Sequence, residues 1–276
     1  MATRLIARKF AEGFMFPEGP VFDRNENLYV VNLKGGCISR ITPDGKVVKF
    51  VETGGAPNGA TIRQNGHLVV ADFGLRAILD ISPSGKIQVI ARQWQDKEFM
   101  GPNDLTFDPN GNLYFTDPEG SSLDNRVGAV YCLTREGKVL LLADGFAYPN
   151  GIAVSLDDKT LYVAETFTGD IYQIPLKGDG TASTDRRVWA RLGEGVWPDG
   201  IALAIDGQLF VACFQKGAVA VIAPNGSLVN YLPAGGAHPT NVAFGGVGNK
   251  QLYITETETN AVYVLDLGIE GQQLFG

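Results

Sequence analysis

The sequence predicts an all-β protein with the architecture of a six-bladed β-propeller, in which four-stranded antiparallel blades surround a central channel. Three observations lead to this fold class. A bend made of proline and a polar residue occurs six times within the 276 residues. A strand of closely similar composition follows each bend, and no stretch has sustained helical periodicity. We therefore expect a single domain over residues 1–276.

The bends set the period of the repeat. Their prolines stand at positions 17, 57, 102, 149, 198 and 239, so successive copies lie 40, 45, 47, 49 and 41 residues apart. This is the period expected of propeller blades with four strands each. The residue after proline is a carboxylate or an amide in the first five copies. The six bends are Phe16–Gly19, Ala56–Gly59, Gly101–Asp104, Tyr148–Gly151, Trp197–Gly200 and His238–Asn241.

Each bend leads into the innermost strand of a blade, and three further strands are expected before the next bend. The second strands all begin with leucine: Leu28–Asn32, Leu68–Asp72, Leu113–Asp117, Leu161–Glu165, Leu209–Cys213 and Leu252–Glu256. The third strands are Cys37–Thr42, Ala77–Ser82, Ala129–Thr134, Asp170–Leu176, Ala218–Ala223 and Ala261–Leu267. Glycine turns then close several of these into hairpins with the fourth strands. Because blades pack face to face, apolar runs are expected rather than strict alternation.

The last blade needs a fourth strand from one end of the chain. The segment Leu5–Phe10 resembles the fourth strands of other units, such as Val139–Ala143. We therefore expect the N-terminal segment to complete the last blade and close the ring. The segment Gln272–Phe275 is the competing candidate for that position.

Composition narrows the range of partners. The formal net charge is -7 and no cluster of lysine and arginine occurs, which argues against nucleic acid as a partner. The start of the chain lacks the apolar run of a secretory signal, and no run of apolar residues is long enough to span a bilayer. We expect a cytoplasmic monomer or weak homo-oligomer that has no membrane partner. The three cysteines fall in different repeats and are expected to be free thiols.

Repeat geometry predicts a polar ring at one end of the channel. Since the residue after each proline starts an innermost strand, the repeat brings six of these side chains together: Glu18, Asn58, Asn103, Asn150, Asp199 and Thr240. Two carboxylates among amides, without lysine or arginine, favour a bound cation because unpaired buried carboxylates are costly. The alternative is that Asn, Asp and Gly only form turns, which leaves the glutamate unexplained. Thr240, in the last copy, is expected to leave its sector of the ring open to substrate.

Oxygen ligands alone favour a hard cation, with Ca²⁺ first and Mg²⁺ or Mn²⁺ next. Zn²⁺ is a further alternative, although the imidazole and thiolate ligands that it usually prefers are missing from the ring. The chain has only two histidines and no G-x-S-x-G motif, so a serine triad or a His-rich zinc site is not expected. His238 precedes the last proline bend, where it either contacts substrate or packs against the bend.

The mouth of the channel is expected to be partly apolar. Its predicted lining consists of Phe14, Phe16, Phe73, Met100, Tyr148, Trp197 and Phe214, and a substrate with apolar parts would fit it. The alternative is that some of these side chains pack between blades. The loop Pro118–Gly128 is the longest polar insertion, and its Glu119 and Arg126 are either substrate contacts or solvated charges. Asn58, Asn103, Met100, Glu119, Trp197 and His238 are the substrate-binding candidates.

These motifs, taken in order, resemble the gluconolactonase, regucalcin (senescence marker protein) and luciferin-regenerating-enzyme family of six-bladed propellers. The resemblance covers essentially the whole chain. It is strongest at Phe16–Pro20, Gly101–Leu105, Leu113–Pro118, Tyr148–Ile152, Leu161–Thr166 and Pro198–Gly200.

The resemblance implies hydrolysis of lactones and a divalent cation held by Glu18, Asn150 and Asp199, with Asn103 a fourth ligand or a substrate contact. The similar diisopropyl-fluorophosphatase propellers use a Glu, Asn, Asn, Asp set around calcium, which corresponds to these same four positions. Sugar-lactone members carry an arginine two residues before the position of Asn103. Here that residue is Gly101, which argues against a sugar-acid substrate.

The expected chemistry is metal-assisted ester hydrolysis. The cation would polarise the lactone carbonyl, while a water activated by the metal or by Asp199 attacks it. Asp199 is the expected catalytic base because it is a ligand with a spare oxygen. One alternative is a phosphotriesterase-like activity on organophosphates at the same site. A second alternative is a propeller that binds a ligand or protein without catalysis.

Overall fold

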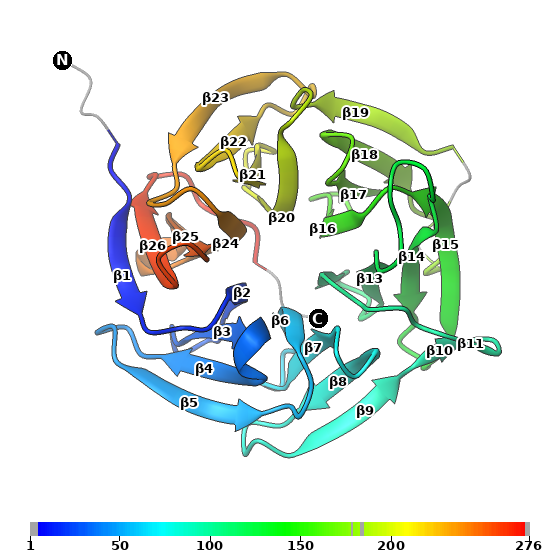
Figure 1. The fold of residues 1–276 in the computed structure, drawn as a ribbon, viewed down its shortest axis with the longest axis horizontal. Helices are drawn as coiled ribbons and strands as arrows, with labels where there is room; N and C mark the ends of the chain where they lie inside the picture. The colour runs from blue at the N-terminus through cyan, green and yellow to red at the C-terminus, as the bar shows by residue number, and fades with distance from the viewer. Residues whose placement is uncertain (1–4, 178, 183–184, 274–276) are drawn as a thin grey trace.

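The computed structural model describes residues 5–177, 179–182 and 185–273 and contains six four-stranded antiparallel sheets arranged around a central axis (Figure 1). The protein is therefore a six-bladed β-propeller, as the repeat predicts. Five blades use four strands that are consecutive in the chain, in the order β2–β5, β6–β9, β12–β15, β16–β19 and β20–β23. The sixth blade has the order β1-β26-β25-β24 and joins the two ends of the chain.

From the axis outward, each blade has an innermost, a second, a third and an outermost strand. The innermost strands are β2 (Pro17–Phe22), β6 (Pro57–Ile62), β12 (Leu105–Phe107), β16 (Pro149–Val154), β20 (Trp197–Leu203) and β24 (Pro239–Gly245). The second strands are β3 (Leu28–Asn32), β7 (Leu68–Asp72), β13 (Leu113–Asp117), β17 (Thr160–Glu165), β21 (Leu209–Phe214) and β25 (Gln251–Glu256). The third strands are β4 (Cys37–Ile41), β8 (Ala77–Ile81), β14 (Gly128–Leu133), β18 (Asp170–Pro175), β22 (Ala218–Ile222) and β26 (Ala261–Asp266). The outermost strands are β5 (Val47–Glu52), β9 (Ile87–Ala91), β15 (Val139–Phe146), β19 (Arg187–Arg191), β23 (Leu228–Pro233) and β1 (Arg8–Glu12).

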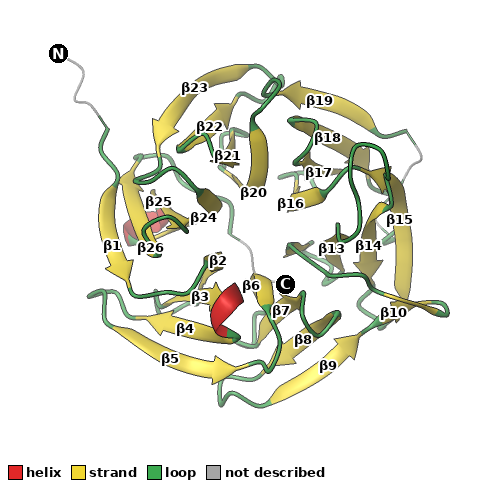
Figure 2. Cartoon of the chain, viewed as in Figure 1, coloured by secondary structure: helices red, strands yellow, loops and turns green. Residues whose placement is uncertain are grey.

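Little structure lies outside the blades. A small hairpin of β10 (Gln93–Trp94) and β11 (Lys97–Glu98) joins the second and third blades. In the described part of the chain, helical structure is limited to the 3-10 turns Leu33–Gly35 and Val247–Asn249 (Figure 2). No helix among the described residues is long and apolar enough to cross a membrane.

The N-terminal segment closes the ring, as predicted. Strand β1 pairs with β26 from Arg8 opposite Val264 to Glu12 opposite Ala261, and the two lie side by side in Figure 1. The strand begins three residues later than expected. The competing C-terminal segment begins elsewhere: the N–H of Gln272 donates to the carbonyl of Leu203 in the fifth blade at 2.8 Å. Positions 274–276 lie outside the described residues.

Apolar side chains fill the spaces between blades. Six buried clusters each combine residues from two neighbouring blades. All residues of β3, β7 and β13 are buried, as expected for second strands that are covered on both faces. Phe14 belongs to the cluster between the sixth and first blades and is only 4% exposed, so its prediction as a mouth residue is wrong. It fills an interblade gap instead. The cysteines are free, as predicted.

A side chain at the end of the second strand fixes the proline bend in five blades. Its oxygen accepts a hydrogen bond from a backbone N–H just before the proline, at 2.6–2.9 Å. The accepting residues are Asn32, Asp72, Asp117, Glu165 and Glu256. The fifth blade has Cys213 at this position. Because the bends carry the predicted ring residues, these contacts preorganise one end of the channel.

Candidate metal centre

The four predicted ligands all lie at the proline-bend end of the channel. Glu18, Asn150 and Asp199 belong to the innermost strands β2, β16 and β20, and Asn103 lies two residues before the start of β12. Glu18, Asn103 and Asn150 are buried, whereas Asp199 is partly exposed. The first, third, fourth and fifth blades therefore each contribute one oxygen-bearing side chain.

Three carboxyl groups share this region. Burial raises the pKa of Glu18 well above its usual range, and the nearby charges of Asp199 and Asp104 raise it further. Burial and the charge of Asp104 likewise raise the pKa of Asp199. Burial raises the pKa of Asp104 to about 7. No lysine or arginine is among the groups that influence these pKa values. Such a site gains stability by taking up protons or a cation.

Asn150 supplies an oxygen without a partner. Its Nδ2 donates to Thr166 Oγ1 at 3.3 Å, and its side chain also hydrogen-bonds Asp199. Its backbone carbonyl accepts from Thr116 Oγ1 at 2.9 Å. The side-chain Oδ1 is buried and has no hydrogen-bond partner. An orphaned buried acceptor costs about 1–3 kcal/mol, so this oxygen fits a cation ligand well.

Sequence reasoning missed two residues of this site, Asp104 and Asn241. Both stand two residues after a proline, where the other four bends have glycine. The Asn241 side chain hydrogen-bonds the carboxyl groups of Glu18 and Asp104, and so crosses between blades. The signal was present in the repeat, since Pro-Asn-Asp and Pro-Thr-Asn depart from the glycine pattern.

Glycines make room for these two side chains. A Cβ on Gly59 would lie 2.9 Å from Asp104 Oδ1, and a Cβ on Gly200 would lie 2.0 Å from the amide of Asn241. Asp104 and Asn241 also line a cavity of about 740 Å³ formed by the innermost strands. They therefore lie between this cavity and the predicted ligands, with which they interact.

Thr240 does not leave its sector open, and that prediction is wrong. It is completely buried, and its Oγ1 donates to the carbonyl of Pro17 at 2.8 Å. The threonine links the sixth blade to the first. Asn58, in β6, is also buried at this end of the channel, and its contact with substrate remains a prediction.

Aromatic side chains form a continuous arc over the fourth, fifth and sixth blades, here called the aromatic rim. Successive ring centroids lie 5.1, 5.9, 6.4 and 4.9 Å apart. All five side chains are partly exposed, and they flank the ends of innermost and second strands on the metal side. The rim consists of Tyr148, Phe167, Trp197, Phe214 and His238. Phe167 was missed, although Phe73 and Phe214, which also follow predicted second strands, are in the predicted lining.

The opposite side of the mouth carries Met100 and Glu119. Met100 is 46% exposed, and its methyl group lies close to Gly120 of the polar loop. The charge of Glu119 contributes, after burial and the charge of Asp199, to a raised pKa of Tyr148, so it faces the same space. The site thus brings these predicted substrate contacts to its edge.

Gly101 explains how this side is packed. A Cβ at this position would lie 2.7 Å from ring atoms of Phe73 and 3.0 Å from Glu119 Cβ. Phe73 therefore occupies the space into which a side chain at position 101 would extend. The Phe16 ring is covered by Lys34, whose Nζ lies 4.7 Å from its centroid.

The chemistry of the donor set is specific. Among the described residues, no three His, Cys, Asp or Glu side chains are arranged to hold a metal ion together. The candidate set instead combines the carboxylates of Glu18 and Asp199 with the amides of Asn103 and Asn150. Two charges and neutral carbonyl oxygens suit a hard divalent cation.

Comparison with known proteins identifies the family of the chain. The profile of the SMP-30/gluconolactonase/LRE-like region matches residues 16–258, which is most of the chain. The chain belongs to this family. The diisopropyl-fluorophosphatase of Loligo vulgaris is 30% identical over 298 residues, covering 97% of this chain and 94% of the relative. The gluconolactonase of Zymomonas mobilis is 28% identical over 270 residues, covering 86% of this chain and 75% of the relative.

Solved structures of the family share the fold. A gluconolactonase from Xanthomonas campestris superimposes with a TM-score of 0.85 at 25% identity, covering 95% of this chain and 90% of the other. Regucalcin from Agrobacterium tumefaciens gives a TM-score of 0.86 at 18% identity, covering 100% and 99% of the two chains, and shows the fold alone. The named relatives support a hydrolase of the lactone or ester class in this family.

Proposed function

We propose that the protein is a divalent-metal-dependent hydrolase of lactones. The observation that carries this proposal is the combination of buried Glu18, partly exposed Asp199 and the unpartnered Oδ1 of Asn150. Asn103 is the fourth proposed ligand. Ca²⁺ is the first choice because all four side chains offer oxygen, and Mg²⁺, Mn²⁺ and Zn²⁺ are the alternatives to test.

The protein's own groups divide the reaction between them. When bound, a divalent cation supplies positive charge that polarises the ester carbonyl and stabilises the developing oxyanion. Asp199 accepts a proton from the attacking water as the carbon–oxygen bond forms. The ring C–O bond then breaks, and the same proton passes to the leaving alkoxide to give the hydroxy acid.

Asp199 is preferred over Glu18 as the base because it is accessible. Glu18 is 5% exposed and its Oε2 accepts a hydrogen bond from the N–H of Gly19. Asp199 is partly exposed, and Asn150 orients its carboxyl group. A base must reach both water and substrate, which favours the exposed group.

The proposed substrate is a lactone with an apolar substituent. The aromatic rim offers such a group a surface to pack on, as would Met100 and Phe73 on the other side. Asn58, Asn103 and Glu119 are the proposed polar contacts. Gly101 offers no cation to a sugar-acid carboxylate, so we expect aliphatic or aryl-substituted lactones to be better substrates than sugar lactones.

Metal analysis followed by a lactone panel tests this proposal. Purified protein is analysed for bound metals, then assayed with sugar, alkyl and aryl lactones, with and without chelator. We expect a bound divalent cation, hydrolysis that stops on chelation and returns with Ca²⁺, and a preference for apolar lactones. Hydrolysis that continues unchanged in the fully metal-free protein would refute the proposed mechanism.

A second candidate is hydrolysis of organophosphate esters at the same site. Its support is the 30% identity to a diisopropyl-fluorophosphatase over 97% of this chain. The same cation and base would act on a phosphoryl centre. A side-by-side measurement of kcat/KM for lactones and fluorophosphates decides between the two, because the better substrate class identifies the main activity.

A further inference from the structure

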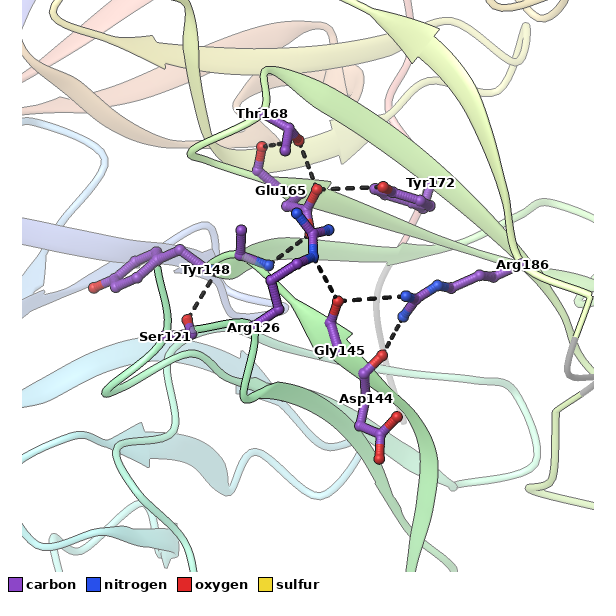
Figure 3. Close-up of polar contacts among 10 residues, drawn as sticks. Ser121, Arg126, Asp144, Gly145, Tyr148, Glu165, Thr168, Tyr172 and Arg186 are labelled. Atoms are coloured by element: carbon purple, nitrogen blue, oxygen red, sulfur yellow. Dashed lines mark hydrogen bonds and ion pairs between the residues drawn. The ribbon is translucent and has the colours of Figure 1, made fainter. Parts of the chain in front are cut away.

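The polar loop 118–128 between β13 and β14 is attached to the fourth blade at two points (Figure 3). Near one end, Ser121 Oγ donates to the carbonyl of Pro118 and accepts from the N–H of Tyr148 at 2.9 Å. Near the other end, Arg126 Nη2 donates to Glu165 Oε1 at 2.6 Å. The loop therefore connects the third blade to the bend that leads to Asn150.

Glu165 is the anchor of this arrangement. Its side chain is fully buried, whereas that of Arg126 is 35% exposed. Glu165 Oε1 also accepts from the N–H of Ala147 at 2.7 Å, and Oε2 accepts from Thr168 Oγ1 at 2.6 Å. A buried carboxylate that accepts this many hydrogen bonds is held in one position. Its negative charge stabilises the paired position of the Arg126 guanidinium.

Two nitrogens of Arg126 donate to acceptors within the protein. Besides the ion pair, its Nε donates to the carbonyl of Gly145 at 3.0 Å. Binding to a substrate through Nε or Nη2 would require Arg126 to leave one of these partners, so a direct substrate contact through them is disfavoured. Arg126 is better suited to holding the loop.

The loop in turn fixes Tyr148. This residue has φ of 68°, a left-handed conformation that is uncommon for a residue with a side chain. The Ser121 contact satisfies its N–H, and the preceding Ala147 N–H is bound by Glu165. Its ring packs against Phe167 at 5.1 Å and points away from the Glu165 cluster in Figure 3. The hydroxyl lies within range of the charges of Asp199, Glu119 and Glu18.

We propose that Arg126 is a positioning residue that, by pairing with Glu165, holds loop 118–128 against the fourth blade and so fixes Tyr148 as one wall of the substrate site. Only the role of Tyr148 as a substrate wall rests on the proposed function. The attachment of the loop stands independently of what the site hydrolyses.

Hydrogen exchange of the metal-loaded, full-length protein tests the attachment. In Arg126→Met, we expect amides of residues 119–128 to exchange at least about tenfold faster than in the wild type, because a charge-assisted bond is lost. Arg126→Lys should restore part of the protection. The paired variant Arg126→Met/Glu165→Gln removes the buried charge and keeps the test valid if the single variant folds poorly. Unchanged exchange in the folded variants overturns the proposal.

Arg186 provides a matched control. It donates to the carbonyls of Asp144 and Gly145 on β15 and its guanidinium lies 4.3 Å from the Phe146 centroid, beside the same cluster. Among the described residues drawn in Figure 3, no hydrogen bond or ion pair joins Arg186 to loop 118–128. Arg186→Met should therefore leave loop exchange unchanged. Equal acceleration in both arginine variants would mean a general loss of stability and would overturn the specific role of Arg126.

Kinetics on the best lactone of the panel test the role of Tyr148. We expect Arg126→Met to raise KM about fivefold or more while kcat changes less than about twofold, with partial rescue by lysine. Tyr148→Ala should give the same pattern. If exchange accelerates but KM stays at the wild-type value, the loop attachment holds and the wall role of Tyr148 is wrong. If the wild type cleaves no lactone, the proposed function fails while hydrogen exchange still decides the attachment.

Discussion

At the residue scale, the aspartate of the candidate metal centre has two tasks that one substitution can separate. As a ligand, Asp199 needs only an oxygen, which an asparagine also offers. As a base, it needs a group that accepts a proton at neutral pH, which an amide cannot do. Its hydrogen bonds from Asn150 and from the N–H of Gly200 fix one geometry for both tasks.

We predict that Asp199→Asn lowers kcat on the best lactone by about a thousandfold or more, because general-base catalysis alone contributes about 100- to 10,000-fold. Metal binding should weaken but remain measurable by calorimetry. Asn58→Ala serves as the comparison for metal binding, since it alters the ring outside the proposed ligand set. Near-normal turnover by Asp199→Asn would exclude this residue as the base.

At the element scale, the ends of the second strands control the bends that carry the site. In the second blade, Asp72 Oδ1 accepts from the N–H groups of Ala56 and Leu75 at 2.9 and 2.8 Å. Asp72 is completely buried, and so is Glu165 at the corresponding position of the fourth blade. Each carboxylate therefore replaces water for backbone donors that the sheet ladder does not satisfy.

We predict that Asp72→Ala destabilises the protein by about 2–4 kcal/mol, because two partly buried donors lose their acceptor at once. Asp72→Asn keeps a carbonyl oxygen at the same place and should cost clearly less. Urea unfolding of both variants at fixed Ca²⁺ measures the difference. Similar losses for Ala and Asn would show that the charge, rather than the acceptor, stabilises the bend.

Elements were largely predictable because their signals are local and repeated. The predicted second and third strands agree with the observed ones to within one residue at each end. The hairpin of β10 and β11 was not predicted, since Gln93–Glu98 interrupts the repeat and has no counterpart in other blades. The path of the closing strand also needed the structure, because two segments matched the fourth-strand pattern.

Site residues were predictable only as far as the repeat carries them. Position after proline identified the six ring residues, whose grouping depends on sixfold geometry, and the resemblance to the family selected Glu18, Asn150 and Asp199 among them as candidate ligands. Asp104 escaped notice because its neighbour Asn103 already filled the expected ring position. Phe14 was misplaced because an aromatic residue near a bend can face either the channel or the next blade, and only tertiary packing decides which.

At the scale of the whole molecule, ring closure depends on one short strand. Strand β1 covers β26, its Ala11 lies in the cluster between the sixth and first blades, and Phe10 packs edge-on against Tyr253 at 5.0 Å. Removing β1 would expose the edge of β26 and would also open the interface between the sixth and first blades. Closure should therefore contribute to the stability of every blade, not only the last.

We predict that deletion of residues 1–12 lowers stability by about 3 kcal/mol or more, the cost of losing a buried aromatic contact and its strand. Deletion of residues 1–6, which keeps β1, is the control and should behave like the wild type. Thermal unfolding and size-exclusion chromatography report stability and self-association through the exposed edge. A wild-type Tm for the longer deletion would mean that another segment closes the ring.

A cation bound at the axis would link four blades, so its effect should appear in global unfolding. In the metal-free protein, burial raises the pKa values of Glu18, Asp104 and Asp199, and repulsion by neighbouring carboxylates raises those of Glu18 and Asp199 further, which means that their charged forms oppose folding. Glu18→Gln removes one such charge and also one proposed ligand.

We therefore predict opposite effects of Glu18→Gln in two conditions. With chelator, the variant unfolds at a higher temperature than the wild type, because its free energy of unfolding is larger by roughly 1–3 kcal/mol. With Ca²⁺ at about 100 times the wild-type Kd, the wild type gains about 2.7 kcal/mol and the variant far less, so the order reverses. Calorimetry of both proteins in both conditions measures this, and parallel shifts would place the cation away from Glu18.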